Sequence, residues 1–374
     1  MNALPHILGF LAAVVLVYLG LQYYLAFWVL RFFPLLPVSP NWVRCGVLLL
    51  ALSFPLSLWL TRAHDGPAAE WLAYASLLYA GVSLIALFCF LMADLAWGAA
   101  RLAGAPGGVR PALAWAAVAA ALLLSVYGRW CAAQPPGVRT VEVRLRGLPS
   151  ALDGFSIAQI SDVHLGLTTP LRKLEQIAER VREIRPDLIV FTGDMLDHGF
   201  GERSRCAALA TGLEAPQGKL AVLGNHEFYL GVAEAEVFYR GCGARLLRGE
   251  ILELPNGLQV AGVDDLRTAG TRPAEVAELL AKLDPKRPSI FLSHQPWMAE
   301  LAAEKGVGLM LSGHTHRGQI FPFHLFVRLA YRYFYGVYRV GGMTLYVTSG
   351  SGYWGPPLRL FSPAEVVAIV LRPA

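Results

Sequence analysis

The feature that most limits what this chain can fold into is a set of four long apolar segments within its first 133 residues. A bilayer core of about 30 Å is crossed by a helix of about 20 apolar residues. The segments run over residues 4–30, 43–60, 71–97 and 112–126, and short loops containing Pro and Gly separate them. The sequence therefore predicts an all-α region of four transmembrane helices over residues 1–133.

Charge is distributed in the same uneven way. Residues 1–133 contain six Arg and three acidic residues, about 7% of positions, whereas about 21% of the following 241 residues are charged. This contrast excludes a purely soluble enzyme, a disordered chain and a fibrous repeat. The net charge of +5 arises without a long basic run, so no nucleic-acid partner is expected.

We expect a multi-pass protein of the cell membrane, which is the inner membrane if the source is Gram-negative. The side that the remaining residues occupy is left open, because the arginines near the membrane divide almost equally. Four flank the first and third loops and three lie on the opposite side: Arg31, Arg44, Arg101 and Arg110 against Arg62, Arg129 and Arg139. Asp94 is the one acidic residue within a predicted span, and it lies near the end of that span.

After a Pro- and Gly-containing stretch at residues 134–137, the pattern changes. We assign residues 134–152 to a linker and first strand, and residues 153–374 to one domain. In that domain, short apolar runs alternate with charged helical stretches such as 171–184 and 274–283. Strands that alternate with helices indicate an α/β layered core.

Five motifs of Asp, Asn and His each follow an apolar run that we expect to be a strand. They are Asp162-Val163-His164, Gly193-Asp194-Met195-Leu196-Asp197, Gly224-Asn225-His226-Glu227, Ser293-His294 and Gly313-His314-Thr315-His316. Open α/β sheets place ligands beyond the carboxyl ends of their strands. Buried Asp and His need partners, and a dinuclear metal site supplies them. Oxygen and nitrogen ligands without thiolate suit Mn²⁺, Fe or Zn²⁺.

In order and spacing, these motifs resemble those of the calcineurin-like metallophosphoesterase superfamily, and the resemblance covers about residues 153–374. It implies a layered αββα β-sandwich. The stretches Gly-His-Thr-His-Arg-Gly-Gln and Leu-Tyr-Val-Thr-Ser-Gly-Ser-Gly are similar to a branch of bacterial membrane-associated phosphoesterases. The family usually has Gly where Arg317 stands, so this chain adds a cation beside the metals.

The resemblance also implies the ligands of two divalent metal ions, for which Mn²⁺ is the first choice and Fe or Zn²⁺ the alternatives. The first ion would be held by Asp162, His164 and His316, and the second by Asn225, His294 and His314. Asp194 would bridge them. Two such ions polarise a phosphoryl oxygen and lower the pKa of a bridging water.

The remaining residues of the motifs receive roles around the metals. His226 would protonate the leaving oxygen or stabilise charge in the transition state, a task that suits an imidazole. Glu227 would orient the His226 ring, the alternative being a solvated loop carboxylate. Asp197 would orient a metal ligand through a hydrogen bond.

Aromatic residues and Arg interleave over residues 321–339. This composition suits a membrane interface or the phosphate of a lipid headgroup. Arg332 in this segment and Arg317 before it are candidate substrate-binding residues. The alternative is a loop that packs on the domain's own core.

Three functions stay open. The first is a membrane-anchored, two-metal phosphoesterase that acts on a phosphoester or pyrophosphate bond of a lipid-linked substrate such as UDP-2,3-diacylglucosamine, which would require a cytoplasmic site. The second is an externally facing phosphodiesterase or phosphatase of broad specificity. The third is a catalytically degenerate membrane binding module, which the intact ligand set disfavours.

Overall fold

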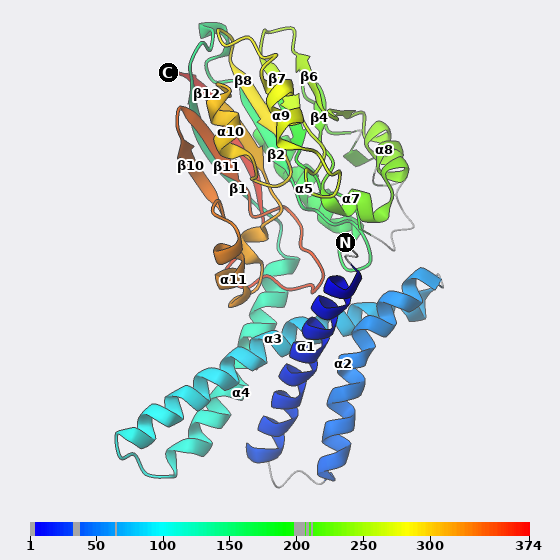
Figure 1. The fold of residues 1–374 in the computed structure, drawn as a ribbon, viewed down its shortest axis with the longest axis vertical. Helices are drawn as coiled ribbons and strands as arrows, with labels where there is room; N and C mark the ends of the chain where they lie inside the picture. The colour runs from blue at the N-terminus through cyan, green and yellow to red at the C-terminus, as the bar shows by residue number, and fades with distance from the viewer. Residues whose placement is uncertain (1–3, 33–37, 64–65, 198–205, 207–208, 211) are drawn as a thin grey trace. The chain divides into compact units, whose positions relative to one another are not determined.

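Two units make up the part of the chain that the computed structural model describes, which is residues 4–32, 38–63, 66–197, 206, 209–210 and 212–374. One unit comprises Met1–Arg129 with Pro356–Leu358, and the other comprises Trp130–Gly355 with Arg359–Ala374. Both are drawn in Figure 1.

Four long helices form the amino-terminal region, and all four are long and apolar enough to cross a membrane. They are α1 (Leu4–Phe32), α2 (Pro40–Ala63), α3 (Pro67–Leu102) and α4 (Val109–Ala133). The Trp28 ring of α1 stacks on the Phe90 ring of α3 with centroids 3.8 Å apart. Asp94 accepts a 2.6 Å hydrogen bond from the Tyr24 hydroxyl. The predicted all-α region is confirmed, and Asp94 on α3 has a polar partner on a neighbouring helix.

In the described part of the remaining chain, twelve strands form two six-stranded sheets. The first sheet has the order β1-β12-β2-β3-β4-β5 and the second β10-β11-β9-β8-β7-β6. Their bounds are β1 Gly137–Leu145, β2 Ser156–Ile160, β3 Leu188–Phe191, β4 Lys219–Ala221, β5 Arg245–Leu246, β6 Glu250–Glu253, β7 Gln259–Gly262, β8 Ser289–Leu292, β9 Leu309–Ser312, β10 Gly336–Val340, β11 Met343–Val347 and β12 Glu365–Pro373.

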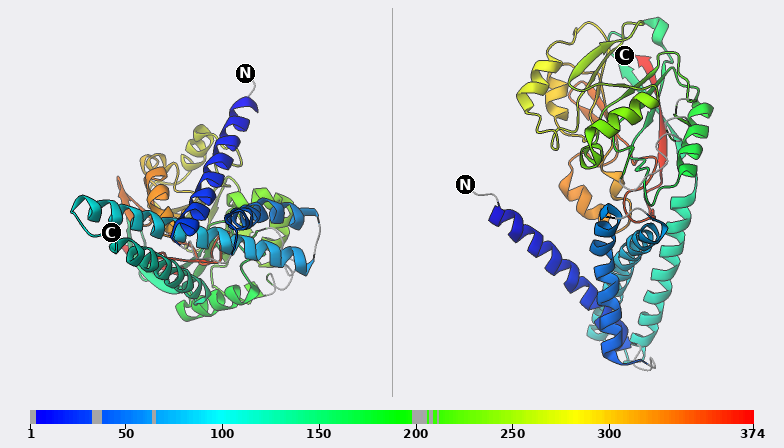
Figure 2. Two further views of the ribbon diagram at one scale, coloured as in Figure 1. Left: turned by 90° about the horizontal axis from the view of Figure 1, so that it is seen from below. Right: turned by 90° about the vertical axis from the view of Figure 1, so that its right-hand side faces the viewer.

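The two sheets pack face to face, and helices cover their outer faces. On the first sheet lie α5 (Leu171–Ile184) and α8 (Val232–Gly241); on the second lie α9 (Pro273–Leu280) and α10 (Ala299–Glu304). Figure 2 shows α9 and α10 on one side of the strands and α5 on the other. This is the expected αββα arrangement. Shorter helices are α7 (Asn225–Leu230), α11 (Phe323–Ala330), and the 3₁₀ turns η1 (Ser150–Leu152) and η2 (His316–Gly318).

The central strands β3 and β8 are largely apolar because both of their faces are buried. In β3, Val190 belongs to the core between the sheets, and Ile189 packs in the cluster under α5. In β8, Ile290 and Phe291 divide in the same way between the inner core and the cluster under α9. Each of these strands therefore contributes to two hydrophobic cores, one on each face of its sheet.

The first strand is closely tied to the end of α4. β1 begins four positions after Ala133 and pairs in parallel with β12 over its whole length, from Gly137 opposite Glu365 to Leu145 opposite Pro373. The Lys173 ammonium group on α5 donates hydrogen bonds to the carbonyls of Ala132 (2.8 Å) and Gln134 (2.7 Å). The junction is therefore held by side-chain contacts as well as by the peptide chain.

Candidate metal centre

All five motifs of the sequence lie in loops that leave the carboxyl ends of strands. Three follow strands of the first sheet, β2, β3 and β4, and two follow β8 and β9 of the second sheet. Because parallel strands of the two packed sheets end at the same edge, the loops meet there. The structure brings together side chains of Asp162, His164, Asp194, His226, His294, His314 and His316 in three overlapping groups, each with donor atoms within 4.8 Å of one another.

Left-handed backbone conformations are concentrated at this edge. Asp162, His164 and Asp194 have φ of 54°, 53° and 53°, and His314 and His316 have φ of 69° and 49°. Such conformations cost free energy in residues other than Gly. Five of them in one cluster indicate that the packing of the loops imposes the positions of these donors.

Two glycines allow the loops to approach one another. A Cβ at Gly224 would lie 2.2 Å from Oδ1 of Asp194, and a Cβ at Gly313 would lie 2.2 Å from Oδ2 of Asp162. Both contacts are far shorter than van der Waals separation. The Gly residues in the third and fifth motifs are thus required by the carboxylates that pack against them.

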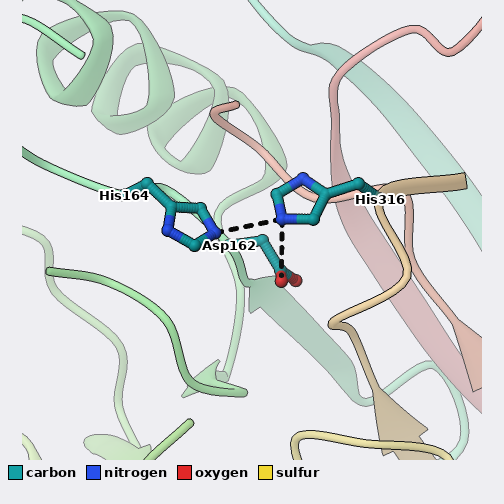
Figure 3. Close-up of side chains that lie close together, drawn as sticks. All are labelled: Asp162, His164 and His316. Atoms are coloured by element: carbon teal, nitrogen blue, oxygen red, sulfur yellow. Dashed lines mark hydrogen bonds and ion pairs between the residues drawn. The ribbon is translucent and has the colours of Figure 1, made fainter. Parts of the chain in front are cut away.

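Asp162, His164 and His316 form the first donor group, shown in Figure 3. Nε2 of His316 lies 3.0 Å from Nε2 of His164 and 3.4 Å from Oδ1 of Asp162. The Asp162 carboxylate also accepts hydrogen bonds from the backbone N–H of His314 at 2.9 and 3.1 Å. Three side chains from two sheets thus direct donor atoms at one point.

Asp194, His294 and His314 form the second group. Nε2 of His294 lies 3.1 Å from Oδ2 of Asp194 and 3.2 Å from Nδ1 of His314. Nδ1 of His294 donates to the carbonyl of Thr192 at 2.8 Å, so Nε2 is the nitrogen that faces the group. Asp194 also lies 3.8 Å from Nε2 of His164, so its carboxylate connects both groups.

The donor set fits two divalent cations. Imidazole nitrogens that face each other at 3.0 and 3.2 Å, beside two buried carboxylates, repel unless a cation or a shared proton lies between them. The side-chain oxygen of Asn225 is buried and, among the described residues, has no hydrogen-bond partner. A buried carbonyl oxygen without a donor is costly, and a metal ion would satisfy it.

His226 lies beside these groups and is held by Asp197. Nδ1 of His226 bonds to one carboxylate oxygen of Asp197, and the other oxygen lies 3.2 Å from Nδ1 of His164. Burial alone would lower the pKa of His226, but the carboxylates of Asp194 and Asp197 outweigh it and raise the pKa to about 9. Asp197 thus orients one predicted ligand and the predicted proton donor together.

Glu227 has a different position from the one we expected. Its buried carboxylate accepts hydrogen bonds from four backbone N–H groups, those of Asp194 (2.9 Å), Met195 (2.7 Å), Leu196 (3.3 Å) and Gly224 (2.7 Å). The His226 ring is oriented by Asp197, while Glu227 joins the loop after β3 to the start of α7. The alternative of a solvated carboxylate is also wrong, because Glu227 is fully buried.

Sequence reasoning missed a chain of buried polar groups behind His314. The Gln295 amide nitrogen donates to both carboxylate oxygens of Asp265 at 2.8 Å, so its Oε1 accepts from the Tyr331 hydroxyl at 3.3 Å. The Tyr331 oxygen in turn accepts from Nε2 of His314 at 2.8 Å. The Asp265 carboxylate can only accept hydrogen bonds, so every donor in this series points toward Asp265. His314 therefore carries its proton on Nε2, and its Nδ1 is unprotonated. Gln295 beside His294 was the only sequence signal.

The two candidate substrate-binding arginines differ in position. Arg317 lies in η2 next to His316, and its guanidinium stacks 4.6 Å above the Tyr335 ring. Arg332 lies on the surface, 78% exposed, where it pairs with Glu300 at 2.8 Å. The Trp354 and Tyr229 rings, which were not singled out, pack edge-on against His226 with centroids 5.8 and 5.4 Å away.

The geometry agrees with what comparison with known proteins shows. Residues 155–318 match the profile of the calcineurin-like phosphoesterase family. A zebrafish (Danio rerio) transmembrane protein with metallophosphoesterase domain is 37% identical over 269 residues, which cover 67% of this chain and 61% of that protein. Its bovine (Bos taurus) counterpart is 34% identical, with 75% and 67% covered. An uncharacterized metallophosphoesterase of Aquifex aeolicus is 35% identical, with 63% and 91% covered.

The chain belongs to the calcineurin-like phosphoesterase family. The alignment spans about three fifths to two thirds of the length of the first animal relatives. Among solved structures, TT1561 of Thermus thermophilus aligns with a TM-score of 0.37 and 16% identity, over 53% of this chain and 90% of that one. Four helices of this chain are long and apolar enough to cross a membrane, and the zebrafish and bovine relatives are described as transmembrane proteins.

Proposed function

We propose that this protein is a metal-dependent phosphoester hydrolase with a dinuclear centre, embedded in the cell membrane. Asp162, His164 and His316 would hold one cation, Asn225, His294 and His314 would hold the other, and Asp194 would serve both. Two divalent ions, Mn²⁺ as first choice, would supply Lewis acidity at a phosphoryl oxygen and an activated water. The convergence of Asp194 on nitrogens from both donor groups supports this assignment most directly.

The chain's own contribution to the reaction centres on His226. Asp197 fixes Nδ1, which leaves Nε2 as the nitrogen that can meet a substrate. The Asp197 carboxylate bonded to Nδ1 favours the protonated ring, which a donor to a leaving oxygen requires. Trp354 and Tyr229 pack around the ring and limit its rotation. Arg317, one residue after His316, is the proposed contact for a substrate phosphate.

For the substrate, we propose an amphiphilic phosphate ester or pyrophosphate taken from the bilayer, for which UDP-2,3-diacylglucosamine is a concrete example. The four bilayer-length helices and the aromatic and cationic residues 321–339 support this choice. A soluble diester taken up on the external side is the second candidate, favoured by the slight excess of Arg in the first and third loops.

The test uses the full chain purified in detergent with Mn²⁺. Wild type is compared with Asn225→Ala, His226→Ala and the control Asn256→Ala, which changes a turn residue outside the site. Mn²⁺ content and hydrolysis of UDP-2,3-diacylglucosamine and a soluble aryl diester are measured. Asn225→Ala should lose Mn²⁺ together with activity. His226→Ala should keep two Mn²⁺ per chain while turnover falls by about 10²–10⁴-fold.

Each result has a defined meaning. Loss of Mn²⁺ from His226→Ala would make that residue a ligand, in line with its place in a donor group with His164 and Asp194. Turnover of both substrates that is insensitive to Asn225→Ala would overturn the dinuclear hydrolase. Turnover of the soluble diester alone would keep the chemistry and favour the externally facing enzyme.

A further inference from the structure

Helix α11 (Phe323–Ala330) is apolar, yet none of its residues is buried. Leu329 is 86% exposed and Phe326 is 62% exposed, and Phe323 and Leu325 are also exposed. Helices that pack on the sheets behave differently: α5 buries Leu174, Ile177 and Ala178 completely. A contiguous apolar surface of this kind in a folded domain marks a place where something else binds.

The residues of α11 divide into two faces. Phe323, Phe326 and Ala330 follow the i, i+3, i+7 spacing of one side, and Leu325 and Leu329 extend it. His324 and Arg328, four positions apart, share the opposite side, and Arg328 is exposed. Residues 317–339 include four Arg and no acidic residue. An apolar face bordered by cationic side chains is typical of helices that lie in a membrane interface.

The helix is also rigidly connected to the metal centre. A Cβ at Gly318 would lie 2.2 Å from Cα of His324, so η2, which carries His316, packs directly on the first turn of α11. Immediately after the helix, Tyr331 bonds to His314. Each end of α11 is therefore linked to a predicted metal ligand through one or two intervening residues.

Covalent connection keeps this domain at a membrane. Only residues 134–136 separate α4 from β1, and Lys173 bonds to carbonyls on both sides of Ala133. A domain tied to the end of a bilayer-length helix by three residues cannot move far from the lipid surface. An anionic lipid surface is the partner that matches both the apolar face and the arginines.

We propose that α11 inserts its apolar face into the headgroup region of the bilayer and so presents the metal centre to substrates at the lipid surface. This inference rests on the proposed function for the identity of those substrates, but the contact with lipid does not. The apolar face is Phe323, Leu325, Phe326 and Leu329.

Lipid contact is measured directly on the full chain in nanodiscs of phosphatidylcholine and phosphatidylglycerol. A bimane probe is attached at Leu329→Cys, or at the control Val237→Cys, which is 67% exposed on α8 of the same domain. Both are made in a background in which Cys45 and Cys131 are serine, because the other three cysteines are buried. Lipids with brominated acyl chains quench a probe that lies among them. We expect at least twofold quenching at position 329 and none at 237.

Equal emission at position 329 in brominated and ordinary lipid would overturn the proposal. If that result came with oxidant-driven disulfide formation between unlabelled Leu329→Cys chains in nanodiscs that hold two chains, the face would bind a second copy. As a functional measurement, Phe326→Asp with Leu329→Asp should lower the ratio of turnover on bilayer-presented substrate to turnover on the soluble aryl diester at least fivefold. Quenching without any hydrolysis would retain the lipid contact and reject the proposed enzyme.

Discussion

At the residue scale, the orientation of His314 is set by groups that do not touch a substrate. Asp265 and Gln295 are buried, and together they require the Tyr331 hydroxyl to donate its hydrogen bond to Oε1 of Gln295. The Tyr331 oxygen then holds the proton of His314 on Nε2 and leaves Nδ1 free toward the second donor group. Partners of this kind tune metal affinity by about 10- to 100-fold in other metal sites.

We therefore expect Tyr331→Phe to weaken binding of one Mn²⁺ by about 10- to 100-fold. The variant keeps the ring and removes the oxygen that accepts from His314. Tyr333→Phe is the matched control, because its hydroxyl bonds to Glu300 on the surface. Chelator competition gives the affinity, and thermal unfolding shows whether stability changed. Equal Mn²⁺ affinities in the two variants would contradict the positioning role.

Residue types and their order were sufficient to predict which side chains gather, because buried Asp, Asn and His at the ends of apolar strands need a shared ligand to satisfy them. They were not sufficient for Tyr331 and Glu227. Tyr331 lies 17 residues after His314 and reaches it only because α11 and η2 pack together. Glu227 follows His226 in the sequence, yet its side chain bonds to the loop after β3. Such contacts depend on tertiary packing, which a local motif does not encode.

At the element scale, the residues that directly follow β3 and β4 must nearly touch. Gly224 caps α7 with φ of −91°, which any residue can adopt, so only its closeness to Asp194 requires Gly. Glu227 strengthens the same contact by binding the backbone of both loops.

Gly224→Ala should consequently lower Mn²⁺ content to one ion or fewer per chain, because the new methyl group displaces the Asp194 carboxylate. Gly137→Ala is the control, since a Cβ there meets its nearest atom at 3.9 Å. Metal analysis and circular dichroism of both variants check the prediction. A Gly224→Ala protein with two Mn²⁺ would show that the loop can relax.

The elements themselves were predictable to different degrees. Long apolar helices and buried central strands carry strong patterns, and the structure has helices and strands there. β5, β6 and β10 were not predicted, because they are short strands or lie at sheet edges with mixed polarity. Residues 321–339, which we expected to act as one aromatic and cationic segment, contain helix α11 and strand β10.

For the whole molecule, four bilayer-length helices imply stable insertion in a membrane. We expect the full chain to stay in the membrane pellet after washing with alkaline carbonate and to be released only by detergent. Sedimentation followed by immunoblotting measures this. Release by carbonate alone would mean that the helices do not span the bilayer. Hydropathy predicts the spans well because lipid imposes one requirement on every residue, but it does not determine which side the catalytic residues occupy.

The parallel pairing of β1 with β12 has a consequence for how the protein is made. β12 lies between β1 and β2, so the strand that follows the apolar helices reaches the rest of its sheet only through β12, a strand made more than 200 residues later. Until β12 has been synthesised, the backbone N–H and C=O groups of β1 have no partner strand. Unpaired strand edges of this kind promote incorrect association. Completion of this sheet must therefore wait until β12 has been synthesised, and loss of β12 would separate β1 from β2.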